Sequence, residues 1–477
     1  MSKKVIDMTV GSPFKNIILF ALPIAIGFML QNLYSLGDVF IVAHALNANA
    51  STGVNMTGSI TFLVLGFCAG MSSGFSVVLS QFVGAKDTVK MRKSVATIIF
   101  LSVVISVITA IIVTILCRWM LELLDTPAEF IDYADIYLKA IFIGLPFTMM
   151  YNVSSEILRA MGDSRTPLVT LILCATINLG LNSLLFIAPQ LTCAWAGWAT
   201  IISQAISAVV GFVVIFKKFP ELRVKKEDFK ISLSFAGKHL LMGVPMSIQF
   251  IITASGCMVQ QQAVNGLPAP APMAQANGSK IDNLFGMLLN GCGVAMATYC
   301  GQNFGAKKYD RIKKGFIAGF GVGAIFTVIS MCCNTFLAVP LSKILLPASS
   351  MDALPVGVTP NDVYDMIFTY NGTLSIFYYF LYLIFMSRQA LQGIGRSTVA
   401  MFGGVAEFIV RFVLSPILAE KAGFIGMCYS NPIAWIVGGV FLTVAFIICF
   451  YKLVKQTPKQ EIPIDLTNQE ASVAVNE

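Results

Sequence analysis

A single carboxylate stands inside the first long apolar segment of the chain. Asp38 lies within residues 16–44, and Gln31 and Tyr34 precede it at spacings that place all three side chains on one helix face. A charge inside a membrane-spanning helix is costly and marks a candidate functional site. A polar stripe with one carboxylate suits the reversible binding of a proton or a sodium ion. The alternative is an Asp that caps the helix or snorkels near the outer surface.

Two asparagines, Asn178 and Asn182, lie four residues apart on one face of a later apolar segment. Their amide oxygens can coordinate sodium. In the simpler interpretation they only bond to neighbouring helices, through contacts worth about 1 kcal/mol or less each in a membrane. In the second half of the chain, Gln260 ends a polar helix face that also carries Gln249 and Thr253. We expect this face to line a cavity.

Two opposite charges, Glu407 and Arg411, lie four residues apart in another apolar segment. The Glu comes first, which is the favourable order for an ion pair on a helix. The pair either neutralises itself so that both charges can stay in the membrane, or it forms a gate or a substrate contact. Among many aromatic residues, Tyr137 suits a cation–π contact with an organic cation. Lys280 faces either the cavity or the outer interface.

The composition excludes a soluble protein and gives no sign of catalysis. Hydrophobic residues make up 56% of the 477 residues and charged ones 12%, whereas soluble domains carry about 25% charged residues. The chain has no GxxxxGK[ST] phosphate loop, so ATP is not expected to bind. Its two His lie apart, and its 11 Cys show no metal-binding spacing. We therefore expect no enzyme, no cofactor, no nucleic-acid partner, and no metal except sodium at Asp38.

The candidate residues lie in apolar runs that are each long enough to cross a bilayer. The helices formed by these runs must bring the candidate residues together. The expected fold is an all-α membrane protein with twelve transmembrane helices in two pseudo-symmetric halves of six. The predicted spans are about 16–44, 57–82, 93–117, 134–158, 167–187, 195–216, 239–263, 273–301, 315–338, 363–388, 398–418 and 424–452.

The distribution of basic residues predicts the orientation. The two tails and every second loop hold 26 Lys and Arg, and the other loops hold three. Basic loops stay in the cytoplasm. We therefore expect a multi-pass protein of the cell (inner) membrane with both termini cytoplasmic. This tally places Arg388 in the loop after the tenth span.

An internal repeat relates the two halves. The loop SQFVGAKD after the second span, at 80–87, matches GQNFGAKK after the eighth, at 301–308. LRAMGDSRTP after the fourth span matches LQGIGRST after the tenth, and ALPIAIGFM matches GVPMSIQFI, an alignment that sets Gln260 opposite Asp38. Halves of six spans have the same orientation and are related by an axis along the membrane normal. Substrates of such folds bind near the midplane, and one half moves against the other.

The repeat and the composition also predict the domain boundaries. We expect a first six-helix bundle over 1–216, a cytoplasmic linker over 217–238 and a second bundle over 239–455. The polar residues 456–477 are expected to be a disordered cytoplasmic tail.

The ordered set of motifs resembles the MATE (multidrug and toxic compound extrusion) family of the MOP flippase superfamily. The resemblance rests on ALPIAIGFMLQNLYSLGDVFIVAHAL, the two GAK loops, LRAMGDSRTP, and INLGLNSLLFI followed by GWAT, and it covers about residues 10–455. It implies that Asp38, Asn178, Asn182 and Thr200 line a cation pocket in the first half. Many members have Asp at the position of Asn182, and an Asn cannot take up a proton.

The resemblance implies a proton- or sodium-coupled antiporter that exports lipophilic or cationic drugs by alternating access. The expected partners are small xenobiotic molecules and the lipid bilayer, with the chain acting as a monomer. The second half lacks an acidic residue at an obvious equivalent place, so we expect coupling through the first half alone. The alternative is a flippase for lipid-linked oligosaccharides or precursors, which would need a larger cationic cavity. A membrane-embedded enzyme or channel would need a catalytic cluster or filter motif, and neither is visible.

Overall fold

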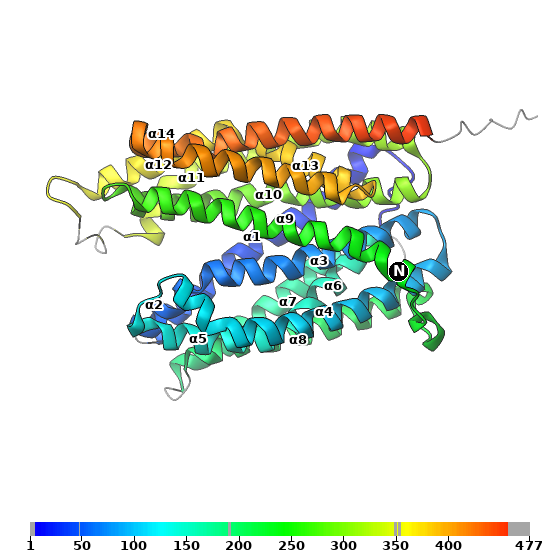
Figure 1. Cartoon of the computed structure of the whole chain (residues 1–477), viewed down its shortest axis with the longest axis horizontal. Coiled ribbons are helices and arrows are strands. Elements are labelled where there is room, and N and C mark those ends of the chain that lie inside the picture. Colours follow the sequence, from blue (N-terminus) through cyan, green and yellow to red (C-terminus); the bar gives the residue numbers. More distant parts are fainter. Residues whose placement is uncertain (1–4, 47, 189–191, 348–350, 352–353, 457–477) are drawn as a thin grey trace, which may run out of the picture.

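The computed structural model describes residues 5–46, 48–188, 192–347, 351 and 354–456, and these residues form helices and no strand. The helices run side by side along one direction and form an elongated bundle (Figure 1). The apolar sequence dictates this arrangement, because in lipid each backbone polar group must be satisfied within its own segment. The predicted all-helical fold is confirmed.

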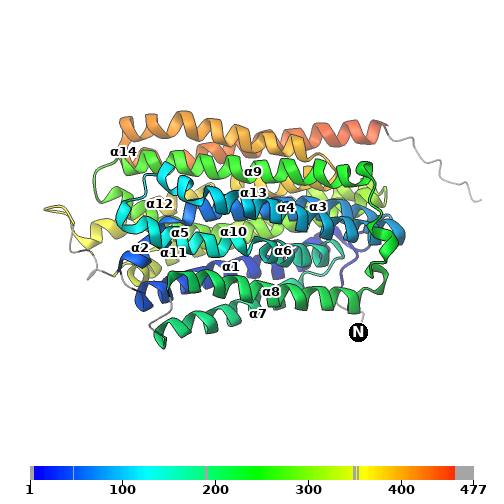
Figure 2. The same ribbon diagram turned by 60° about the horizontal axis from the view of Figure 1, so that its bottom comes forward.

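The first half of the chain contains long helices and a few short ones. They are α1 (Pro13–Ala45), α2 (Ala48–Met56), α3 (Gly58–Gly84), α4 (Thr88–Leu123), α5 (Ala128–Ile143), α6 (Leu145–Ala160), α7 (Arg165–Asn182) and α8 (Cys193–Lys218). Figure 2 shows α7 and α8 at the edge of the bundle opposite α14. Short 3-10 turns at Pro220–Leu222 and Lys226–Phe229 follow α8.

The second half repeats this order without a counterpart of α2. Its helices are α9 (Leu233–Asn265), α10 (Ala271–Gly305), α11 (Tyr309–Leu345), α12 (Pro360–Ile376), α13 (Tyr378–Gly393) and α14 (Ser397–Gln456). The 60 residues of α14 are far too many for one crossing, which takes about 20. Gly423 has non-helical backbone angles and divides α14 into two arms, 397–422 and 424–456.

The described residues contain nine helices that are long and apolar enough to cross a membrane, and two bent helix pairs that could each form one more span. The pairs are α5 with α6, bent by 51°, and α12 with α13, bent by 50°. The spans predicted over 134–158 and 363–388 therefore each contain a bend, which the apolar pattern does not indicate. Pro146, the second residue of α6, cannot donate a backbone hydrogen bond to α5, which explains the first bend. The total of twelve spans stays a prediction.

The backbone repeats the sequence symmetry. Lys86 and Lys307, from the two GAK loops, both adopt positive φ angles, 55° and 58°. Gly162 and Gly395, from the second pair of matching motifs, do the same at 85° and 82°. The bends between the paired helices fall at equivalent places too, directly after Ile143 in the first half and after Ile376 in the second. Matching turns and matching bends indicate that the two halves are built alike.

The first helix of each half crosses to the other half. Near the start of α1, Ala25 packs so tightly on α10 that a Cβ at Gly291 would lie 2.7 Å from its backbone. Further along α1, Gly37 lies against Leu179 of α7. α9 mirrors this, since Gly243 packs on α3 while Gly256 packs on α14. α1 and α9 therefore each contact both halves.

Candidate functional site

The predicted polar cluster of the first half is assembled in the structure. The Asn178 side chain donates a hydrogen bond to Thr200 Oγ1 at 3.1 Å, and Asn182 donates to Asn178 Oδ1 at 3.1 Å. The Thr200 hydroxyl in turn donates to the carbonyl of Ala196 on its own helix. Both Asn side chains are fully buried. The cluster joins α7 to α8 and offers amide and hydroxyl oxygens.

Asp38 belongs to α1, but its side chain lies outside the described residues. The preceding residue, Gly37, is close to Leu179, the neighbour of Asn178, because a Cβ there would lie 3.3 Å from the Leu side chain. The fold therefore places this stretch of α1 against α7, the helix that bears Asn178 and Asn182.

The other predicted residues of the first half lie apart from this cluster to different degrees. Tyr137 on α5 packs against the apolar group formed by Val42, Leu185 and Ala196, beside the α8 segment that carries Thr200. Tyr34 is partly buried on α1, and Gln31 is exposed. The structure thus brings Tyr137 close to the part of α8 that carries Thr200. Gln31 lies outside the cluster.

Glu407 and Arg411 pair as predicted, but a third residue joins them. Arg411 Nη2 lies 3.5 Å from one Glu407 oxygen, and Arg388 donates a short hydrogen bond to the other. Arg411 Nε also donates to Asn431 Oδ1 at 3.1 Å, across the two arms of α14. The assignment of Arg388 to a loop was wrong, because α13 continues to Gly393 and buries this side chain. The helix runs on because its last turn, ALQG, still packs against α10 and α9.

Gln260, on α9, is buried, and its amide nitrogen has no hydrogen-bond partner among the described residues. Gln249, three turns earlier, accepts a hydrogen bond from Gln392 at 3.1 Å. The expected polar face of α9 is therefore partly used to join α9 to α13. Lys280 is exposed, and Lys139 pairs with Asp135 at 2.6 Å.

The sequence reading missed one carboxylate of the second half. Asp282 on α10 accepts a hydrogen bond of 2.8 Å from the Tyr378 hydroxyl of α13. Ser279, one turn earlier, bonds to Tyr370 of α12 at 3.2 Å. The available signal was an Asp within an apolar span, the same signal that identified Asp38. Coupling through the first half alone stays a prediction, and Asp282 is a carboxylate of the second half that it did not consider.

The two GAK loops meet at the end of the bundle that carries the N-terminal segment. We call this the basic end. Gly84 of α3 and Gly305 of α10 pack reciprocally, because a Cβ at either position would lie 1.8 Å from the carbonyl oxygen of Gln302 or Gln81, respectively. Those glutamines also bond across the halves, Gln81 to the carbonyl of Gly393 and Gln302 to that of Ala160, at 3.0 and 2.8 Å. The halves are in backbone contact here.

The N-terminal segment crosses this contact. The backbone N–H of Ile6 donates to the carbonyl of Gly162 in the first half. Two residues later, the N–H of Met8 donates to the side chain of Gln302 in the second half at 3.0 Å. Arg311 of α11 donates to the carbonyls of Met8 and Val10. The segment therefore ties the two halves together at the basic end.

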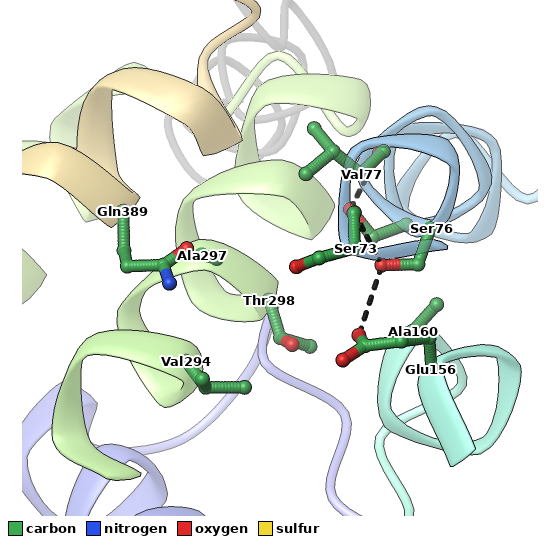
Figure 3. Close-up of a pocket in the computed structure, with 10 residues that line it drawn as sticks. Ser73, Ser76, Val77, Glu156, Ala160, Val294, Ala297, Thr298 and Gln389 are labelled. Atoms are coloured by element: carbon green, nitrogen blue, oxygen red, sulfur yellow. Dashed lines mark hydrogen bonds between the residues drawn. The ribbon is translucent and has the colours of Figure 1, made fainter. Parts of the chain in front are cut away.

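A small polar cavity of about 10 Å³ lies between the halves just inside this contact (Figure 3). The Glu156 carboxylate reaches it from α6, accepting the Ser76 hydroxyl at 3.1 Å and pairing with Arg159 at 2.7 Å. Gln389 and Thr298 line it from the second half. This volume is that of about one water molecule. Just inside the contact of the two GAK loops, the space between the halves is therefore small.

No group of three or more metal-binding side chains exists among the described residues. The candidate site is instead two buried polar clusters, one in each half, and a closed basic end between them. In one, Asn178, Asn182 and Thr200 offer oxygen atoms beside α1. In the other, Arg388, Glu407 and Arg411 combine two positive charges with one negative charge.

Known proteins share both the sequence pattern and the fold. The family model MatE matches residues 23–184 and 245–417. The probable multidrug resistance protein YoeA of Bacillus subtilis (strain 168) is 26% identical over 329 residues, 67% of this chain and 71% of that protein. The FAD transporter of Shewanella oneidensis (strain ATCC 700550 / JCM 31522 / CIP 106686 / LMG 19005 / NCIMB 14063 / MR-1) is 21% identical over 342 residues, 70% of this chain and 75% of that protein.

A solved structure described as the outward-facing conformation of a multidrug resistance MATE family transporter of the MOP superfamily has a TM-score of 0.85. At 17% identity it covers 94% of this chain and 98% of that one, so the two share a fold. The resemblance predicted from the motifs is confirmed. Because the family match spans most of both halves, this chain is a multi-pass membrane transporter of the MatE family.

Proposed function

We propose that this protein is a secondary antiporter that exports lipophilic, often cationic, drugs from the cytoplasm in exchange for a proton or a sodium ion. The observation that carries the proposal is the buried cluster of Asn178, Asn182 and Thr200 beside the helix that bears Asp38. Relatives named as multidrug resistance proteins support the cargo class. The basic end is then the cytoplasmic end, in line with the distribution of Lys and Arg.

The oxygen atoms of the cluster suit a hard monovalent cation. Asn and Thr oxygens are neutral ligands, and the Asp38 carboxylate supplies the charge that balances sodium or takes up a proton. Asn182 cannot accept a proton at physiological pH, so proton coupling in this half would depend on Asp38 alone. The Asp282 carboxylate, bonded to Tyr378, is a second candidate carrier in the other half.

Because α1 contacts both halves, a movement of α1 on cation binding would also change the contact between the halves at the basic end. Ala25 of α1 packs on α10, and Gly27 and Gly37 of the same helix lie against α7. A cation that draws the Asp38 segment toward Asn178 would shift the start of the same helix relative to the second half. The contacts of the N-terminal segment and of Gln302 lie directly beside that start. If the open and closed states bind the cation with different affinities, cation binding shifts the equilibrium between the two states. This shift couples cation entry to drug export.

Ethidium transport by the purified protein in proteoliposomes tests the function. We expect ethidium movement to follow an imposed pH gradient or an imposed sodium gradient, and to stop when that gradient is collapsed. A fluorescent lipid-linked oligosaccharide in the same vesicles provides the comparison for the flippase alternative. Gradient-independent flipping of that lipid, without ethidium transport, would overturn the antiporter. Lys280 is exposed and Lys139 is paired with Asp135, so neither lysine contributes to the cationic cavity that a flippase would need.

A further inference from the structure

The second half holds an excess of buried positive charge. Arg388 and Arg411 share one carboxylate, Glu407, so the three side chains together carry one net positive charge. Each of the three is at most 8% exposed. An uncompensated charge buried in this way costs several kcal/mol unless another group offsets it. Asn431, the one further partner of Arg411, is neutral.

Two donors of this cluster, and one on the neighbouring helix α9, lack acceptors. Among the described residues, Arg388 Nε, Arg411 Nη1 and Gln260 Nε2 are buried and have no partner. A donor left unsatisfied in this way costs about 1–3 kcal/mol, and folded proteins keep few of them. Gln392 Oε1 is an unpartnered acceptor one turn from Arg388, but it is neutral and leaves the charge in place. The cluster lacks an anion.

The repeat places this cluster where the first half has its cation pocket. In the alignment that sets Gly162 opposite Gly395, the position of Asn178 corresponds to Arg411. In the alignment of ALPIAIGFM with GVPMSIQFI, Asp38 corresponds to Gln260. The first half therefore presents a carboxylate and amide oxygens where the second presents a guanidinium and an amide. The polarity of the site is reversed between the halves.

Gly256 brings α9 close to the guanidinium. A Cβ at this position would lie 3.5 Å from Arg411 Nη1, so the unpartnered nitrogen faces a helix stretch without a side chain. Gln260 follows one turn later on α9, about 6 Å along the helix axis. The two unpartnered donors thus lie along one stretch of α9, the helix that packs on both α14 and α3.

We propose that Arg411, Arg388 and Gln260 form an oxyanion subsite that binds the carboxylate or phosphate group of an anionic or zwitterionic substrate. The proposal rests on the transport function proposed above and extends its cargo beyond cations. Two guanidinium groups suit an oxyanion because charged hydrogen bonds from Arg are strong and directional. A related protein is named as a transporter of FAD, a molecule that carries a diphosphate.

Equilibrium binding of three probes to the purified full-length protein tests the subsite. FAD supplies a diphosphate, norfloxacin a carboxylate, and ethidium a cation without an oxyanion. We expect R411Q and R388Q each to weaken the binding of FAD, norfloxacin or both about tenfold or more, as loss of a charged hydrogen bond does. Ethidium binding should stay unchanged. Loss for FAD alone identifies a phosphate site, and loss for norfloxacin alone a carboxylate site.

The matched control is K139Q, which also removes a partly buried positive charge from a membrane helix but lies outside the cluster. R411K, which keeps the charge, should recover part of the binding. A parallel loss for all three probes would show that the arginines only hold the fold. Failure of the wild type to bind either anionic probe would also overturn the subsite. Neither of these two binding results would affect gradient-driven ethidium transport. The antiporter proposal is therefore tested separately from the oxyanion subsite.

A second variant keeps the test decisive if an arginine variant does not fold. Q260E attaches a carboxylate to the cluster without removing a charge partner. We expect it to raise the thermal stability of the protein and to block FAD and norfloxacin, because it supplies the missing anion from within. Unchanged binding of both probes in Q260E would contradict the proposal.

Discussion

At the scale of single residues, the proposed cation pocket of the first half is built on a short chain of hydrogen bonds. Asn182 donates to Asn178, which donates to Thr200. The sequence predicted this set only through the family resemblance, since two Asn at helical spacing also suit simple helix packing. Asp282 was missed because the repeat drew attention to the position opposite Asp38, where Gln260 stands. Its partner Tyr378 lies far along the chain, on α13, and follows no local pattern.

Replacing Asn178 tests this pocket at its centre. N178A removes the acceptor of Asn182 and the donor to Thr200, so we expect ethidium transport to fall about tenfold or more, while the fold loses only about 1 kcal/mol. T176A is the matched control, because Thr176 is exposed on the same helix and bonds only to the carbonyl of Ile172. Transport rates in proteoliposomes at equal protein amounts give the comparison. Equal rates for N178A and T176A would exclude the cluster from the transport cycle.

At the scale of helices, the sequence predicted the apolar spans well and their shapes poorly. Hydropathy locates a span but does not show that α5 and α6 meet at 51°, or that α13 carries Arg388 inward. The charge of Arg388 led to the wrong prediction that it lies in a loop. A buried Glu407 partner allows this Arg to lie inside the helix bundle. The sequence placed the glycines of the two GAK motifs in loops that mark the repeat. Their role in backbone contact between α3 and α10 depends on pairing across the repeat, which a local motif does not show.

Enlarging one of these glycines should force the basic end apart. A Cβ at Gly84 would lie 1.8 Å from the Gln302 carbonyl oxygen, so G84V cannot keep the closed contact. Overpacking of this kind costs about 1–3 kcal/mol, enough to shift the population toward the open form. We expect spin labels at positions 86 and 307 to move apart in G84V. G58A is the control, since its added methyl group meets nothing within 4 Å. Unchanged label distances in G84V would contradict this account of closure.

The linker after α8 is tied to the bundle by one carboxylate. Asp228 accepts hydrogen bonds from the Arg92 guanidinium at 2.6 Å and from the Lys225 backbone N–H at 2.7 Å. Burial alone would raise the pKa of Asp228, but these two hydrogen bonds outweigh it and hold the pKa below the ordinary Asp value. A lowered pKa means that the contribution to stability is present above the unfolded-state pKa. It is lost as the pH falls through the lower, folded-state pKa.

Hydrogen exchange of the linker checks this contact. In D228N at neutral pH we expect faster amide exchange over residues 223–230 than in the wild type, because the charged acceptor is gone. The wild type should lose the same protection only in strongly acidic buffer. E227Q is the control, as Glu227 is exposed in the same turn. Equal protection in D228N and the wild type would show that the ion pair does not hold the linker.

At the scale of the whole molecule, the two halves share an architecture and differ in charge. The shared turns at Lys86 and Lys307, and the equivalent bends at Gly144 and Phe377, follow the sequence repeat. Sequence alone could predict that repeat, because its motifs keep the same order. Sequence alone could not predict that α1 and α9 each contact both halves, because this arrangement depends on packing between helices far apart in the chain. In the proposed mechanism, this packing links the cation pocket of one half to the contact between both halves.

The most direct test of the antiporter is ethidium efflux with sodium and pH gradients imposed separately, for the wild type, D38N and D282N. Our account predicts that wild-type efflux follows one of the two gradients and that D38N abolishes this dependence. Loss in D282N as well would assign a coupling role to both halves. Wild-type rates and gradient dependence in D38N would contradict the account, because Asp38 would then carry no coupling ion.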